Sequence, residues 1–108
     1  MKSFMPIPKR LLPHDINVRV PDGKGGFNEP VTVRHVAVQM AQSVCDDEHR
    51  SAAAGSGTVF LDAMNSDGAF DVPAGSRVEL QGHSYYVTES AKFETVQGQV
   101  HHWELSIR

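Results

Sequence analysis

The chain has 108 residues, 40% of them hydrophobic, and a formal net charge of −3. This length suits one domain, no stretch approaches the ~20 consecutive apolar residues of a transmembrane helix, and the net negative charge disfavours a DNA-wrapping protein. The single cysteine, Cys45, excludes an intrachain disulfide and fits a reducing compartment. We therefore expect one globular domain over residues 1–108, made in the cytoplasm.

The first segment, residues 1–13, contains several prolines, which remove amide donors and disfavour helix, so we expect it to be extended. It also lacks the unbroken apolar run of a signal peptide. Residues 16–20 alternate between apolar and polar side chains, as a half-buried strand does. Three glycines within residues 21–26 then predict a turn between two paired strands.

The longest β-prone run covers residues 31–40, and its apolar side chains change face midway. Two of them share one face and three share the other (Val31 and Val33; Val36, Val38 and Met40). A β-bulge or a strong twist near Arg34–His35 accounts for this change of phase. The alternative is a strand that is covered on both faces.

Residues from about 40 to 57 show no strand alternation and are rich in serine, alanine, glycine and acidic side chains. Their apolar periodicity is poor, so we expect a long loop with at most a transient helix. Long connections in small domains are more often functional than accidental. The candidate functional residues of this loop are Asp46, Asp47, Glu48, Arg50, Ser51, Gly55 and Gly57.

The rest of the chain predicts short strands separated by turns. We expect a strand at 58–63, a turn at 65–68, a hairpin of 77–80 with 85–88 around a turn at 81–83, and a last strand from about 98 to 107. The last strand should pair antiparallel with the one before it and lie in a sheet or at its edge. The predicted fold class is all-β: a small antiparallel β-barrel or sandwich, SH3-like or similar, with one long loop.

No group of residues predicts catalysis or a metal centre. The sequence has six histidines, of which His101 and His102 are adjacent in a predicted strand and should therefore point to opposite faces. The serine of 55–57 lacks the glycine spacing of a nucleophile elbow, and the glycines of 23–26 lack the following helix of a phosphate-binding loop. We expect no enzymatic activity, no cofactor and no bound metal.

A set of segments in order along the chain resembles the minor capsid proteins of tailed bacteriophages and prophages. These segments are Pro6–Leu12, Val31–Val38, Phe60–Ala63, Asn65–Ser66, Gly75–Val78, Gly82, Tyr85–Val87 and His101–Leu105. The resemblance covers nearly the whole chain. Its candidate family-motif residues are Pro8, Lys9, Arg10, His35 and Trp103.

The resemblance implies a head-closure, or stopper, protein of the head–tail connector. Such a protein forms a homo-oligomeric ring, on the order of six or twelve subunits, at the head–tail junction of the virion. The portal or adaptor protein would lie on the head side of the ring, and tail-terminator or tail proteins on the other side. Packaged DNA would pass through the channel without sequence-specific binding, the loop at 40–57 would meet the channel, and no membrane would be involved.

Two other functions fit a chain of this kind. One is a tail-completion or tail-terminator protein from the same gene neighbourhood. The other is a small β-barrel module that binds nucleic acid, which requires basic residues interleaved with aromatic ones on a sheet face. The aromatic side chains here lie among carboxylates, which argues against such a module (Tyr85, Tyr86, Phe93 and Trp103 among Glu89, Glu94 and Glu104).

Overall fold

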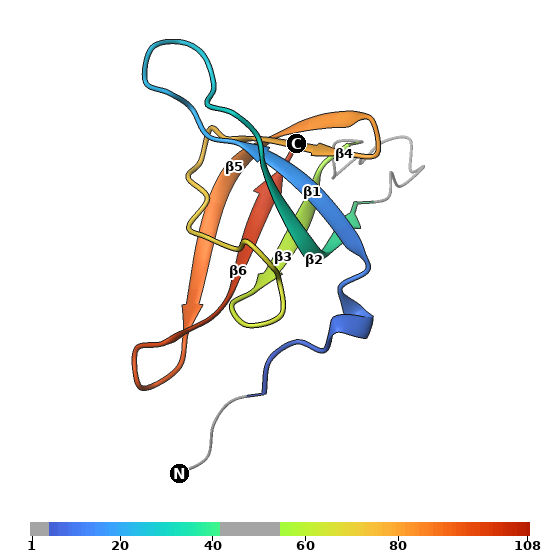
Figure 1. The fold of residues 1–108 in the computed structure, drawn as a ribbon, viewed down its shortest axis with the longest axis vertical. Helices are drawn as coiled ribbons and strands as arrows, with labels where there is room; N and C mark the ends of the chain where they lie inside the picture. The colour runs from blue at the N-terminus through green and yellow to red at the C-terminus, as the bar shows by residue number, and fades with distance from the viewer. Residues whose placement is uncertain (1–4, 42–54) are drawn as a thin grey trace, which may run out of the picture.

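The computed structural model describes residues 5–41 and 55–108. This part of the chain is all-β, and six antiparallel strands close into a barrel in the order β1-β2-β3-β6-β5-β4 (Figure 1). The predicted all-β class is confirmed, in its barrel form. The elements are η1 (Lys9–Leu11), a 3-10 turn, and the strands β1 (His14–Arg19), β2 (Val31–Met40), β3 (Gly57–Asp62), β4 (Arg77–Leu80), β5 (His83–Glu94) and β6 (Val100–Ile107).

The last strand pairs antiparallel with the strand before it, as predicted, and lies inside the sheet rather than at its edge. β6 pairs antiparallel with β3 on one side and with β5 on the other, so that Ile107 is opposite both Gly57 and Val87. The barrel is closed by β1 and β4, which pair over three residues and are far apart in the sequence. In the part of the chain described, no helix is long and apolar enough to cross a membrane.

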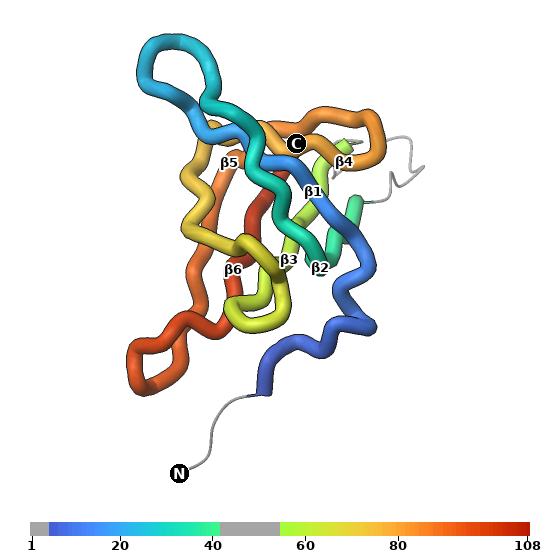
Figure 2. The backbone as a smooth tube through the Cα atoms, in the orientation of Figure 1, coloured from blue at the N-terminus to red at the C-terminus, as the bar shows by residue number. Residues whose placement is uncertain are grey.

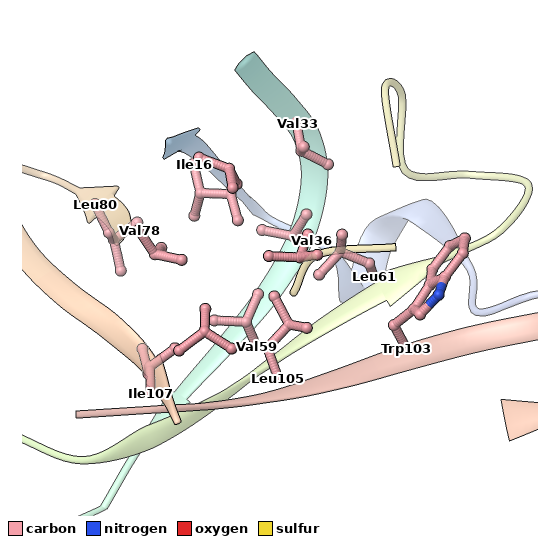
Figure 3. Close-up of a cluster of buried hydrophobic side chains, with 13 residues drawn as sticks. Ile16, Val33, Val36, Val59, Leu61, Val78, Leu80, Trp103, Leu105 and Ile107 are labelled. Carbon is pink, nitrogen blue, oxygen red and sulfur yellow. The ribbon is translucent and has the colours of Figure 1, made fainter. Parts of the chain in front are cut away.

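The core follows from the alternation of side chains along these strands. Trp103, Leu105 and Ile107 of β6 point inward, and the strands around them contribute mostly valines (Figure 3). Successive side chains of a strand point to opposite faces, so an alternating strand buries one face and leaves the other for solvent. The buried core side chains are Ile16, Val18, Val33, Val36, Val59, Leu61, Val72, Val78, Leu80, Val87, Trp103, Leu105 and Ile107.

The change of phase in β2 is a β-bulge. Asp15 of β1 pairs with Arg34, and His14 pairs with Val36, which leaves His35 as an extra residue. His35 has φ 61, a left-handed conformation that is uncommon outside glycine. The extra residue resets the alternation, so Val33 and Val36 are both fully buried. The predicted bulge near Arg34–His35 is confirmed.

The β4–β5 hairpin has a shorter turn than the sequence predicted. Only Gln81 and Gly82 lie between the strands, with φ 50 and 83, whereas His83 already pairs with Leu80 in β5. Two successive positive φ values are typical of the two-residue hairpin turn whose twist matches that of the strands. The register places Val78 opposite Tyr85 and Leu80 opposite His83.

The predicted loop at 40–57 is shorter at both ends, because Met40 and Gly57 pair as the terminal residues of β2 and β3. Gly57 lies so close to β2 that a Cβ atom there would be 2.7 Å from the carbonyl oxygen of Gln39. Ala41 donates its amide to the carbonyl of Ser56 at 2.7 Å and continues this ladder. The rest of the predicted loop, residues 42–54, lies outside the described residues.

Candidate functional site

The first and last residue pairs between β3 and β6 mark the two ends of the barrel. At one end, which we call the loop end, Gly57 lies beside Ile107. At the other, which we call the N-terminal end, Asp62 lies beside His102. The segment from Met5 onward and the connection after β3 meet there (Figure 2).

Asp62 binds the N-terminal segment to the barrel. Its side chain is fully buried, and its Oδ1 accepts the amide of Ile7 at 2.8 Å, across 55 positions of sequence. Its Oδ2 accepts the amides of Met64 and Asn65 at 3.0 and 2.8 Å, in an Asx-type turn. The side-chain amide of Asn65 donates to the carbonyl of Ile7 at 2.8 Å, so both backbone polar groups of Ile7 are bonded.

The same connection also supports the bulge in β2. Ser66 donates its hydroxyl to the carbonyl of His35 and accepts the amide of Asp62 at 2.8 Å. Arg34 and Asp67 exchange two backbone hydrogen bonds of 3.0 Å each. Gly68 follows with φ +86, and a Cβ atom there would lie 2.9 Å from the carbonyl oxygen of Thr32. The bulge and the turn therefore stabilise each other.

The five candidate family-motif residues fall into three structural positions. Pro8 precedes η1, which leaves Lys9 and Arg10 exposed at the surface. His35 forms the bulge. Trp103 is 7% exposed and its indole N–H donates to Asp71 at 2.5 Å, which ties the β3–β4 connection to the core. His35 and Trp103 therefore act in the fold, whereas Lys9 and Arg10 are available to a partner.

Of the candidate loop residues, the structure describes only two. Gly55 has φ +93, and a Cβ atom there would meet no other atom within 4 Å. Gly57 is the first residue of β3. The other five, Asp46, Asp47, Glu48, Arg50 and Ser51, lie outside the described residues. An open cavity of about 650 Å³ lies at the loop end, between the last residues of β2 and the C-terminal Arg108.

The prediction that His101 and His102 point to opposite faces is wrong. Phe93 pairs with His102 and Glu94 with Val100, so His101 is the extra residue of a second β-bulge. The bulge turns the two side chains toward one another, with 2.8 Å between their Nδ1 atoms. His102 also stacks on Phe93, with ring centroids 4.7 Å apart. Over residues 5–41 and 55–108, no group of three or more metal-ligating side chains is placed to hold an ion.

Several exposed apolar side chains belong to the elements that meet at the N-terminal end, while Leu11, Val31 and Tyr86 are exposed on η1, β2 and β5. Met5, Met64 and Val96 are 80%, 75% and 92% exposed, and Phe93 is 42% exposed. Met5 is held there by its carbonyl contact with His101, Met64 by the Asp62 turn, and Val96 by the turn between β5 and β6. Exposed apolar side chains gathered on one part of a small protein indicate contact with other proteins.

The described residues form a small closed β-barrel with an anchored N-terminal segment. The family model described as "Minor capsid protein" matches residues 8–107. The chain therefore belongs to the minor capsid protein family, and it is a structural protein of the phage virion. No curated protein and no solved structure matches the chain.

Proposed function

We propose that this protein is the head-closure, or stopper, component of the phage head–tail connector. In this role it forms a homo-oligomeric ring below the portal or adaptor protein, retains the packaged DNA and offers the tail its attachment platform. Membership of a family of capsid proteins, rather than of enzymes, supports a structural role of this kind. The assignment to the head–tail connector rests on the sequence resemblance, in which a series of short segments occurs in the same order as in connector proteins.

The observation that carries this proposal is the difference between the two barrel ends. The N-terminal end presents apolar side chains, which suit a permanent protein contact, and the segments that carry Met5 and Met64 are fixed by the Asp62 hydrogen bonds. Ala41 and Ser56 lie at the loop end, and the sequence between them includes the acidic run Asp46–Glu48. A protein in the middle of a connector needs two such different faces, because a different partner lies on either side of it.

The ring contact follows from the same geometry. Because the barrel is closed, its strands have few free edges, and neighbours must meet through side chains and loops. A heterologous contact of this kind generates a ring when its rotation closes. Within such a ring we place the loop of residues 41–56 at the channel, where its acidic residues disfavour a tight grip on DNA.

The loop provides the test. Phage lacking this gene are complemented with the wild-type chain, with a chain in which residues 46–56 are replaced by a short Gly-Ser link, or with a full-length control that carries Asp46→Asn, Asp47→Asn and Glu48→Gln. We expect the shortened chain to fold, because a surface loop contributes little to core burial. Its particles should leak DNA or fail to join tails.

The control separates loop length from loop charge, since it keeps every residue position and removes only the acidic charges. Shortened-loop phage that retain DNA and reach the wild-type titre would contradict the channel role of the loop. Heads that keep their DNA in the complete absence of the gene, but carry incomplete tails, would instead identify a tail-completion protein.

A further inference from the structure

The second bulge brings two histidines into an unusual contact. The Nδ1 atoms of His101 and His102 are 2.8 Å apart, and the rings meet edge to face at 84°. The remaining nitrogen of each ring contacts an oxygen atom. Nε2 of His101 lies 2.7 Å from the carbonyl oxygen of Met5, and Nε2 of His102 lies 3.0 Å from Oε2 of Glu104.

These contacts determine how many protons the two rings hold. A carbonyl oxygen and a carboxylate oxygen only accept hydrogen bonds, so both Nε2 atoms must carry a proton. The contact between the two Nδ1 atoms requires one more proton, because two unprotonated nitrogens would face each other with their lone pairs. All three hydrogen bonds are therefore made when the pair holds three ring protons.

Three ring protons give the pair one positive charge, since two neutral imidazoles hold two protons between them. The carboxylate of Glu104 balances that charge across 3.0 Å. With only two protons, one of the three contacts lacks its hydrogen. With four protons, two N–H groups would point at each other over 2.8 Å, and the rings must separate.

The surroundings leave Glu104 as the charged group that acts on the pair. On β5, Phe93 stacks on His102, while Lys92 and Glu94 form an ion pair of 3.7 Å with each other. On β3, the carboxylate of Asp62 is opposite His102 in register but is occupied by three backbone amides. The turn of residues 95–99 has no titratable side chain.

We propose that His101 and His102 form a proton-operated clasp for the N-terminal segment. When the pair holds a single shared proton, it ties the carbonyl of Met5 to β6. Loss of that proton leaves two lone pairs facing each other over 2.8 Å, and gain of a second one places two N–H groups there. In either state the ring of His101 is displaced, and the Met5 carbonyl loses its donor. Because Met5 is one of the exposed apolar residues of the N-terminal end, the clasp controls the shape of that surface.

Nuclear magnetic resonance of the intact chain tests this proposal directly. The ring ¹⁵N signals are followed with pH, together with the order of the Met5 methyl group. We expect a shared proton between the two Nδ1 atoms at intermediate pH, seen as a coupling across the N–H···N bond. Met5 should be most ordered in that range and lose order on both sides of it, as coupled sites titrate in two steps.

Three variants separate the clasp from general loss of structure. His101→Ala should release Met5 at every pH. His102→Ala removes the ring that faces Nδ1 of His101, so Met5 should stay docked and its order should not change with pH. His83→Gln, at an exposed position of β5, should behave as the wild type. Unchanged amide signals of Leu105 report that the barrel is intact.

Measurements on the wild-type chain can contradict the proposal even if a variant fails to fold. Two rings that titrate independently, with no shared proton, would overturn it. So would a Met5 methyl group whose order stays constant over the pH range in which both rings change their protonation.

Discussion

The carboxylate of Asp62 should be worth more to the stability of this barrel than any other charged side chain described here. Asp62→Ala removes the acceptor for the amides of Ile7, Met64 and Asn65. A buried donor left without a partner costs about 1–3 kcal/mol. Met64 is largely exposed, so water replaces part of the loss there. We therefore expect the free energy of unfolding to fall by about 2–4 kcal/mol, out of the roughly 5–15 kcal/mol typical of a domain.

The assay is urea denaturation followed by Trp103 fluorescence, because this residue lies in the core next to the affected turn. The midpoint should fall while the slope with denaturant stays the same, since the surface exposed on unfolding hardly changes. Asp67→Ala is the matched control: its side chain is 62% exposed and meets His35 only at 4.0 Å, so the change should stay within about 0.5 kcal/mol. An Asp62→Ala chain within about 0.5 kcal/mol of the wild type would refute this role of the carboxylate.

Three other predictions concern the backbone and the histidines. His35→Val should destabilise the barrel by about 1–3 kcal/mol, because a β-branched residue is strained at φ 61, whereas His35→Gly should stay close to the wild type in the same denaturation assay. Gln81→Asn should raise the free energy of unfolding by about 0.5–1 kcal/mol, because Asn-Gly is the preferred pair for this hairpin turn; an unchanged or lower midpoint would contradict the turn assignment. Elemental analysis of the purified chain should find no stoichiometric transition metal, and about one tightly held ion per chain would require a new interpretation of His101 and His102.

The strands, bulges and turns that leave a pattern in a short stretch of sequence were predictable. Alternation located β1 and β2, and the change of phase between Val33 and Val36 located the first bulge, because both valines must enter the same core. Turn residues located the β4–β5 hairpin. The closure of the barrel by β1 and β4 was left open as barrel or sandwich, because three residue pairs between distant strands leave no pattern in the sequence.

The features of the candidate site that were missed depend on contacts between distant residues. The Asp62 to Ile7 bond spans 55 positions, so its only local sign is an aspartate before a polar turn, which indicates an Asx-type turn but no partner. The second bulge leaves no pattern in the sequence, because His101 and His102 are both amphipathic. A shift of the strand register by one residue at this point does not change the alternation of apolar side chains. Two adjacent histidines in a strand therefore need not point to opposite faces.

The measurement that tests the central proposal most directly is electron cryomicroscopy of the head–tail junction in intact virions. We predict density for a closed ring of six-stranded barrels between the portal or adaptor protein and the tail, with the N-terminal end and the loop end facing different partners. Copies of the barrel on the outer capsid surface, or at the distal end of the tail, with none at the junction, would contradict the proposed head-closure function.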